Sequence, residues 1–167
     1  MSIGIFYGSN TGATREVAEQ IKKELGLEAT LHDIALTELS AFDDYTQVII
    51  GTSTWGDGDL QDDWDEKFDD FSEVDFTGKK VAFFGLGDQE LHGDYFLDGM
   101  AQLHAVVVKN AATIVGNGWS TEEYDFGDSE AIVDDAFVGL AIDVDNEEDL
   151  TEARVKKWVS GIKAEFS

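Results

Sequence analysis

The stretch GSNTGAT, residues 8–14, has the composition of a loop that holds a phosphate. It follows a short apolar run, IGIFY, and precedes a helical pattern. The first turn of a helix has unpaired N–H groups and the positive end of the helix dipole, so it binds anions without a basic side chain. Gly8 and Gly12 would let the backbone approach closely. Further donors would come from Ser9, Asn10, Thr11 and Thr14. The alternative is a capped helix after a glycine turn.

Two other loops carry flat side chains. TSTWGDGDLQDDW, residues 52–64, places Trp55 between small residues directly after an apolar run. GLGDQELHGDYF, residues 85–96, places His92 and Tyr95 after another apolar run. Each aromatic alone is compatible with ordinary loop packing. Together they indicate a planar ring held between two loops and joined to the phosphate.

Strand-like apolar runs alternate with helical stripes along the whole chain. The strand-like runs are 3–7, 28–33, 47–53, 80–87, a run starting at 112, and 137–143. Helical stripes are expected at 17–25, 36–42, 60–71, 96–107 and 155–166, with a loop-like insert at 119–135. This alternation predicts an α/β fold with a parallel sheet and helices on both faces. In such sheets ligands bind outside the carboxyl ends of the strands, where the three loops would meet.

Composition narrows the class of protein. The 167 residues predict one domain, 1–167. The 36 Asp and Glu against 11 Lys and Arg, a formal net charge of -25, argue against nucleic-acid binding. The chain lacks cysteine and has three separated histidines, so we expect no metal site. We see neither a signal peptide nor a membrane span, which favours a cytoplasmic protein without membrane insertion.

Four motifs, in order, resemble those of flavodoxins. They are FYGSNTGAT, TWGDGDLQDDW, FFGLGDQ, and the closing segment WSTEEYDF…FVGLAIDVDNEEDLTEARVKKWV. The last is similar to the long-chain subgroup. The resemblance implies a three-layer fold whose five-stranded parallel sheet has the order 2-1-3-4-5, with strand five split by an insert.

The resemblance also implies a non-covalent FMN and the residues that hold it. The phosphate would be held by Ser9, Asn10, Thr11, Gly12, Ala13 and Thr14. One side of the ring system would be lined by Thr54, Trp55, Gly56, Asp57 and Gly58. Gly87 and Asp88 would contact the pyrimidine edge, and Asp145 would lie near the ribityl chain. No separate catalytic residue is expected.

The chain departs from the flavodoxin pattern at three places, one of which is Ser53, where long-chain members often have proline. Where the family usually has a tyrosine on the outer ring face, this chain has His92. We favour His92 for that position, and Tyr95 is the competitor. Since an imidazole gains charge near neutral pH, we expect a pH-dependent second reduction potential. Gly56, which resembles the short-chain subgroup, can adopt positive φ freely and predicts a stable semiquinone.

By resemblance the chain is a low-potential one-electron carrier rather than an enzyme, acting as a monomer. Acidic residues around the ring would lower its potential and steer basic partners. An alternative for these acids is a solvated surface. Implied partners are ferredoxin–NADP reductase, photosystem I, nitrogenase reductase or other ferredoxin-dependent enzymes. The other reading is an FMN-dependent NAD(P)H:quinone-type reductase on the same fold. A response-regulator-like domain is rejected, because the first strand does not end in acids.

Overall fold

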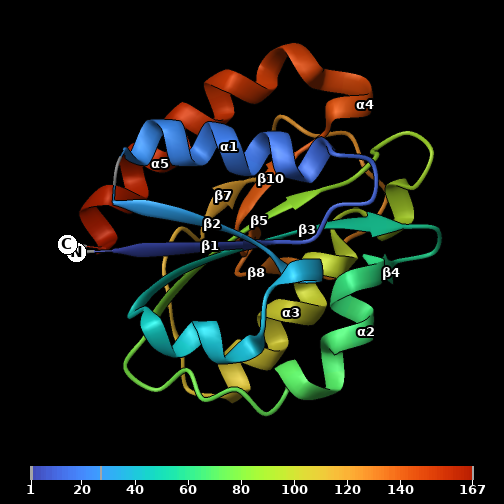
Figure 1. Ribbon diagram of the computed structural model, residues 1–167. Coiled ribbons are helices and arrows are strands. Elements are labelled where there is room, and N and C mark those ends of the chain that lie inside the picture. Colours follow the sequence, from blue (N-terminus) through green and yellow to red (C-terminus); the bar gives the residue numbers. More distant parts are fainter. Residues whose placement is uncertain (1, 27, 167) are drawn as a thin grey trace.

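A mostly parallel sheet lies between two layers of helices in the computed structural model, which describes residues 2–26 and 28–166 (Figure 1). The main path of the sheet runs β10-β5-β3-β1-β2. Its strands are β1 Ile3–Tyr7, β2 Ala29–Asp33, β3 Gln47–Trp55, β5 Lys80–Leu86 and β10 Leu140–Ile142. Read from the other edge, this is the predicted order 2-1-3-4-5, which is confirmed. Two short strands join the path: β4 (Asp59–Leu60) pairs with β3, and β6 (Thr113–Ile114) pairs with β5.

Helices cover both faces of the sheet. The longer ones are α1 Ala13–Leu25, α2 Asp62–Phe71, α3 Asp98–Lys109 and α5 Thr151–Phe166. The remaining turns are α4 Val144–Glu147, η1 Ile34–Leu36, η2 Leu39–Asp44, η3 Gly93–Tyr95 and η4 Glu148–Leu150. Figure 1 shows α1 and α5 side by side on one face, and α2 and α3 on the other. None of the helices in the described part of the chain is long and apolar enough to cross a membrane.

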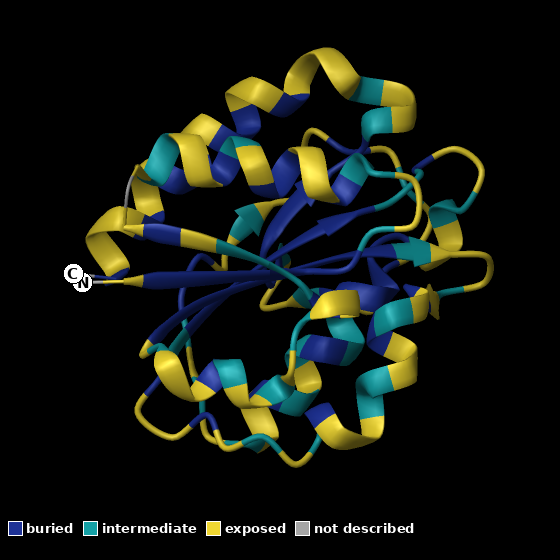
Figure 2. Cartoon of the chain, viewed as in Figure 1, coloured by how far each residue is buried: buried dark blue, intermediate teal, exposed yellow. Residues whose placement is uncertain are grey.

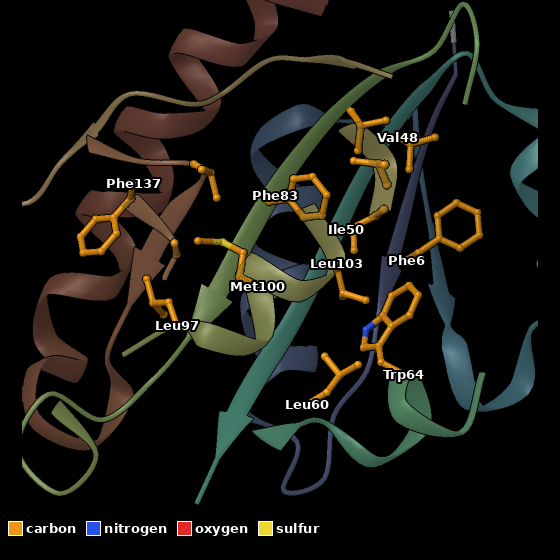
Figure 3. Packing of buried hydrophobic residues seen from close by; sticks show 14 of the residues in the cluster. Phe6, Val48, Ile50, Leu60, Trp64, Phe83, Leu97, Met100, Leu103 and Phe137 are labelled. Atoms are coloured by element: carbon orange, nitrogen blue, oxygen red, sulfur yellow. The ribbon is translucent and has the colours of Figure 1, made fainter. Parts of the chain in front are cut away.

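Side-chain alternation along the strands builds one core on each face. Phe6 and Phe83 pack with α2 and α3, whereas Ile5 and Phe84 pack with α1 and α5. Figure 2 shows the central strands buried along most of their length, and Figure 3 shows Phe83, Ile50 and Leu103 within the α3-side core. Parallel strands that are buried on both faces read as continuous apolar runs, which is why the sequence pattern located them.

The fifth strand of the sheet is split, as the resemblance implied. The segment β6 pairs with the start of β5 and β10 with its end. Between them, β7 (Trp119–Ser120), β8 (Ile132–Val133) and β9 (Ala136–Phe137) form a small antiparallel sheet. The insert is therefore more structured than the predicted loop.

The prediction of one continuous strand at 137–143 is wrong. Phe137 belongs to the small sheet, and the chain enters the main sheet only at Leu140. Gly139 lies between the two, where a Cβ would come 2.2 Å from the Phe83 carbonyl oxygen. A residue with a Cβ would collide with β5 here, which explains the glycine at the point where the chain passes from one sheet to the other.

The predicted helical stripe at 36–42 forms two 3₁₀ turns, η1 and η2, instead of an α-helix. The Lys67 ammonium donates to the carbonyl oxygens of Ile34 and Thr37, at 2.6 and 2.7 Å. These carbonyls are satisfied by α2 instead of by a continuing helix. Two other predicted stripes, 60–71 and 96–107, started too early, since Leu60 lies in β4 and Phe96 precedes α3.

Candidate functional site

A cavity of about 630 Å³ opens at the carboxyl ends of β1, β3, β5 and β10. It lies where the chain order of the sheet reverses between β1 and β3, the place where ligands bind in open α/β sheets. The predicted site residues that line it are Thr11, Ala13, Thr14, Thr54, Trp55, Gly87, Asp88, His92 and Asp145. The structure thus brings together parts of all three predicted loops and the segment after β10.

The phosphate loop has the geometry of an anion cradle. Gly12 precedes α1 in the left-handed region, with φ 95°, and no side chain caps the helix. The first N–H groups of α1 therefore lack a side-chain acceptor within the described residues, beside a cavity that Ala13 and Thr14 line. Thr14 is buried. An unsatisfied helix start next to a cavity fits a phosphate group.

Ser9 and Asn10 support this loop and do not line the cavity. The Ser9 hydroxyl accepts a hydrogen bond from the Gly12 N–H at 2.9 Å. The Asn10 carbonyl oxygen accepts one from the Gln61 amide at 2.9 Å. Gln61 also caps α2 and is fully buried, so Asn10 ties the phosphate loop to the start of α2. A Cβ at Gly8 would lie 2.1 Å from the Gln61 Oε1, which explains the glycine there.

The second loop is a hairpin between β3 and β4 that presents an indole. Thr54 pairs with Leu60 and Trp55 with Asp59, so β4 fixes the direction in which the loop turns. The Trp55 Nε1–H donates to the Ser53 hydroxyl at 2.8 Å, while its side chain is 38% exposed. An anchored but exposed indole on a cavity wall is suited to stacking against a flat ligand.

The tip of this hairpin needs glycine twice. Gly56 has φ 49° and Gly58 has φ 92°, which other residues adopt at a cost. Gly56, Asp57 and Gly58 do not line the main cavity. The Gln102 amide donates to the Gly58 carbonyl oxygen at 2.8 Å, which ties the tip to α3.

The third loop is organised by the Asp88 carboxylate. It accepts hydrogen bonds from the backbone N–H groups of Glu90 and Leu91 and from the Asn146 side chain. Partial burial acts to raise the pKa of Asp88, but the hydrogen bonds outweigh it and hold the pKa below its ordinary value. Asp88 is therefore a fixed negative charge at the cavity wall, and it links the third loop to α4.

Asp145 contributes a second carboxyl to the same wall. Burial, followed by repulsion from Asp88 and Asp143, raises the pKa of Asp145. Asp143 is fully buried, caps α4 and accepts hydrogen bonds from the Gln89 backbone and side chain. These bonds hold the carboxyl-terminal ends of β5 and β10 in register around the cavity.

His92 and Tyr95, the two candidates for the outer ring face, lie in different places. His92 lines the main cavity together with Trp55, whereas Tyr95 does not. Tyr95 lines a neighbouring cavity of about 540 Å³ together with Asp57, and His92 lines this cavity as well as the main one. A Cβ at Gly58 would lie 3.4 Å from the Tyr95 ring, so Tyr95 sits beside the hairpin tip. Of the two, only His92 lines the main cavity, and its place on the outer ring face stays a prediction.

Six further residues of the main cavity were not among the predicted site residues. They are Ser53, Leu86, Glu90, Leu91, Val144 and Asn146. Leu91 is 80% exposed, which is unusual for a large apolar side chain next to a binding loop. Its apolar character within an otherwise polar loop was a usable signal. Asn146 offered none, because its role depends on a contact with Asp88 from a distant segment.

A phosphate cradle after β1, with an indole and an imidazole on the loops after β3 and β5, defines a doubly wound α/β protein that binds a mononucleotide with a flat ring system. The family model described as flavodoxin matches residues 5–158. The chain belongs to the flavodoxin family.

Relatives from several bacteria match over nearly their whole length. The chain is 46% identical to a flavodoxin of a Nostoc species, covering 98% of this chain and 96% of that protein. It is 44% identical to flavodoxin 1 of Escherichia coli, covering 98% and 93%. The crystal structure of Fusobacterium nucleatum flavodoxin bound to flavin mononucleotide has 31% identity and a TM-score of 0.94, covering 99% of each chain.

Proposed function

We propose that this chain is an electron carrier that binds FMN without a covalent bond and passes on single electrons at low potential. One observation carries the proposal: a helix start without a side-chain cap, the Trp55 indole and the His92 imidazole meet at a single cavity. Flavodoxin relatives that match nearly the full chain support it. Bound FMN supplies the redox chemistry, and the protein supplies binding, orientation and electrostatics.

The first role of the protein is to hold the phosphate. We assign it to the backbone N–H groups at the start of α1 and to the hydroxyls of Thr11 and Thr14, which lie at the cavity. Ser9, Asn10 and Gly12 act by shaping the loop, through the contacts of Ser9 with Gly12 and of Asn10 with Gln61.

Its second role is to orient the ring and exclude water from it. We place the ring between the Trp55 indole and the His92 imidazole, with Gly87 and Asp88 at its pyrimidine edge. A stacked flat group gains both burial of apolar area and favourable ring geometry. The Gly56–Gly58 turn lies beside Trp55, and the positive φ of Gly56 and Gly58 is a backbone conformation that glycine adopts without strain.

Its third role is electrostatic. Asp88 and Asp145 lie on the cavity wall, and the pKa of Asp145 is raised chiefly by burial and then by repulsion from Asp88. Carboxylates at this wall repel added negative charge, so they lower the potential at which electrons enter. By lowering this potential, the two carboxylates make the reduced protein a stronger electron donor.

We propose basic redox proteins as partners, of the ferredoxin–NADP reductase type or among ferredoxin-dependent enzymes such as photosystem I and nitrogenase. Exposed acids follow the Trp55 hairpin into α2, namely Asp57, Asp59, Asp62, Asp65 and Glu66. Charge of one sign around a cofactor steers an oppositely charged partner and makes association depend on salt. Electrons would then pass across the exposed cavity mouth.

Stopped-flow reduction tests this function against the quinone-reductase alternative. We expect NADPH alone to reduce the FMN-loaded protein slowly, and a catalytic amount of ferredoxin–NADP reductase to make the reduction fast. Raising NaCl from 50 to 500 mM should slow the second reaction, because salt screens the attraction to the basic partner, and should not slow the first, because NADPH and the chain are both negatively charged. Fast reduction by NADPH alone would assign the chain to the reductase class and overturn the carrier proposal.

A further inference from the structure

A second cavity, of about 370 Å³, lies between α1 and α5. Its apolar lining is Ala13, Val17, Val144 and Val155, and its polar lining is Glu16, Gln20, Lys23, Glu24, Glu148, Thr151 and Glu152. We name this cavity the α1–α5 groove. Figure 1 shows the two helices running side by side, and α4 and η4 contribute the residues that precede α5.

Two oxygens of the α1–α5 groove have no hydrogen-bond partner among the described residues. They are the Thr151 hydroxyl and the Gln20 Oε1. Thr151 is 5% exposed, so water reaches its side chain poorly. Leaving a buried polar atom unsatisfied costs about 1–3 kcal/mol, and native proteins rarely tolerate it without a reason. Both oxygens can accept hydrogen bonds, so a donor is the complement that the groove lacks.

The charges at the groove select a cation. Four glutamates line it against one basic residue, Lys23. One of the four, Glu152, is already paired with the Lys156 ammonium at 3.1 Å. The remaining carboxylates, on both sides of the groove, would attract a positive group and repel a phosphate or carboxylate.

The apolar residues define the rest of the ligand. Three valines and an alanine offer methyl groups to a methylene chain, while the buried oxygens and carboxylates receive N–H groups. We propose that the α1–α5 groove binds an aliphatic amine of the polyamine class, with one ammonium group donating to Thr151 and Gln20. This site is separate from the proposed FMN cavity, although Ala13 and Val144 line both.

The test follows spermidine binding to the FMN-loaded protein by ¹⁵N NMR in 150 mM NaCl. Salt at this level weakens the non-specific attraction of the spermidine cation to a protein of net charge -25. We expect saturable shifts of backbone amides that cluster at Gln20 and Thr151. Shifts that spread over the acidic surface of α2 without saturating would show non-specific attraction and overturn the proposal.

Paired variants separate a specific site from general charge. Thr151→Val removes the hydroxyl at constant shape and should weaken spermidine binding at least about tenfold, because the lost hydrogen bond is to a charged group, whereas Thr151→Ser should stay within about twofold of the original chain. Glu148→Gln should weaken binding, and Glu73→Gln, an exposed glutamate beyond α2 on the other face of the sheet, should not. Because Thr151→Val removes an unsatisfied group, the variant should unfold no more easily than the original chain. Unchanged spermidine affinity in Thr151→Val, or equal losses in both glutamate variants, would refute the site.

Discussion

Replacing Gly12 by alanine tests the backbone geometry of the phosphate loop. Gly12 has φ 95°, and a Cβ built there would meet nothing within 4 Å. The cost of Gly12→Ala therefore comes from the backbone conformation alone, about 1–2 kcal/mol. We expect the free energy of unfolding of the FMN-free protein to fall by this amount.

Gly161 provides a matched control. It lies within α5, and a Cβ there also meets nothing within 4 Å. Its backbone is helical, so Gly161→Ala should raise the free energy of unfolding by about 0.5–1 kcal/mol. Both substitutions add a methyl group in open space, yet the structure predicts changes of opposite sign in the free energy of unfolding.

Urea unfolding followed by tryptophan fluorescence measures both variants. The stabilities of the two variants should differ by roughly 1.5–3 kcal/mol, which is about 1 M in the urea midpoint for a slope near 2 kcal/mol/M. If Gly12→Ala were as stable as Gly161→Ala, the left-handed backbone conformation of Gly12 before α1 would be refuted. The anion cradle built on it would then fail as well.

Three further predictions concern the ring and pH. Trp55→Ala should weaken FMN binding by roughly 1–3 kcal/mol, the usual cost of losing an aromatic stack. Quenching of flavin fluorescence measures this affinity. An unchanged affinity would show that the ring does not stack on Trp55. His92→Tyr should flatten the pH dependence of the lower reduction potential, as measured by potentiometry, because tyrosine lacks the imidazole's capacity to gain a positive charge. Tyr95→Phe should leave that dependence intact. Burial lowers the pKa of His32 and His104, so the unfolded chain takes up protons more readily and stability should fall as pH drops below about 6.5. His32→Asn with His104→Asn should reduce that fall in urea unfolding at pH 7.5 and 5.5, and an equal fall would contradict it.

The strands of the sheet and the three binding loops were predictable, because both leave local signals. Strands buried on both faces read as apolar runs, and the phosphate loop carries its glycines and hydroxyls in seven consecutive residues. The order of the strands and the split of the fifth followed from the resemblance to flavodoxins, and the structure agrees with them.

The features that were missed depend on contacts between distant segments. Lys67, in α2, donates hydrogen bonds to the carbonyl groups of Ile34 and Thr37 around the η1 turn. Gly139 must be glycine because β5 passes beside it. Asn146 joins the cavity through Asp88, which lies in another loop. Sequence periodicity reports which face a residue occupies and not which distant group it meets.

The central claim is that the start of α1 binds a phosphate whose attached ring lies against Trp55. Titration of the FMN-free protein with FMN and with riboflavin, under the same conditions, tests it most directly. Since a hydrogen bond to a charged group contributes about 1.5–3 kcal/mol, two such bonds predict that FMN binds at least about 100-fold more tightly than riboflavin. Equal affinities for the two flavins would contradict the account.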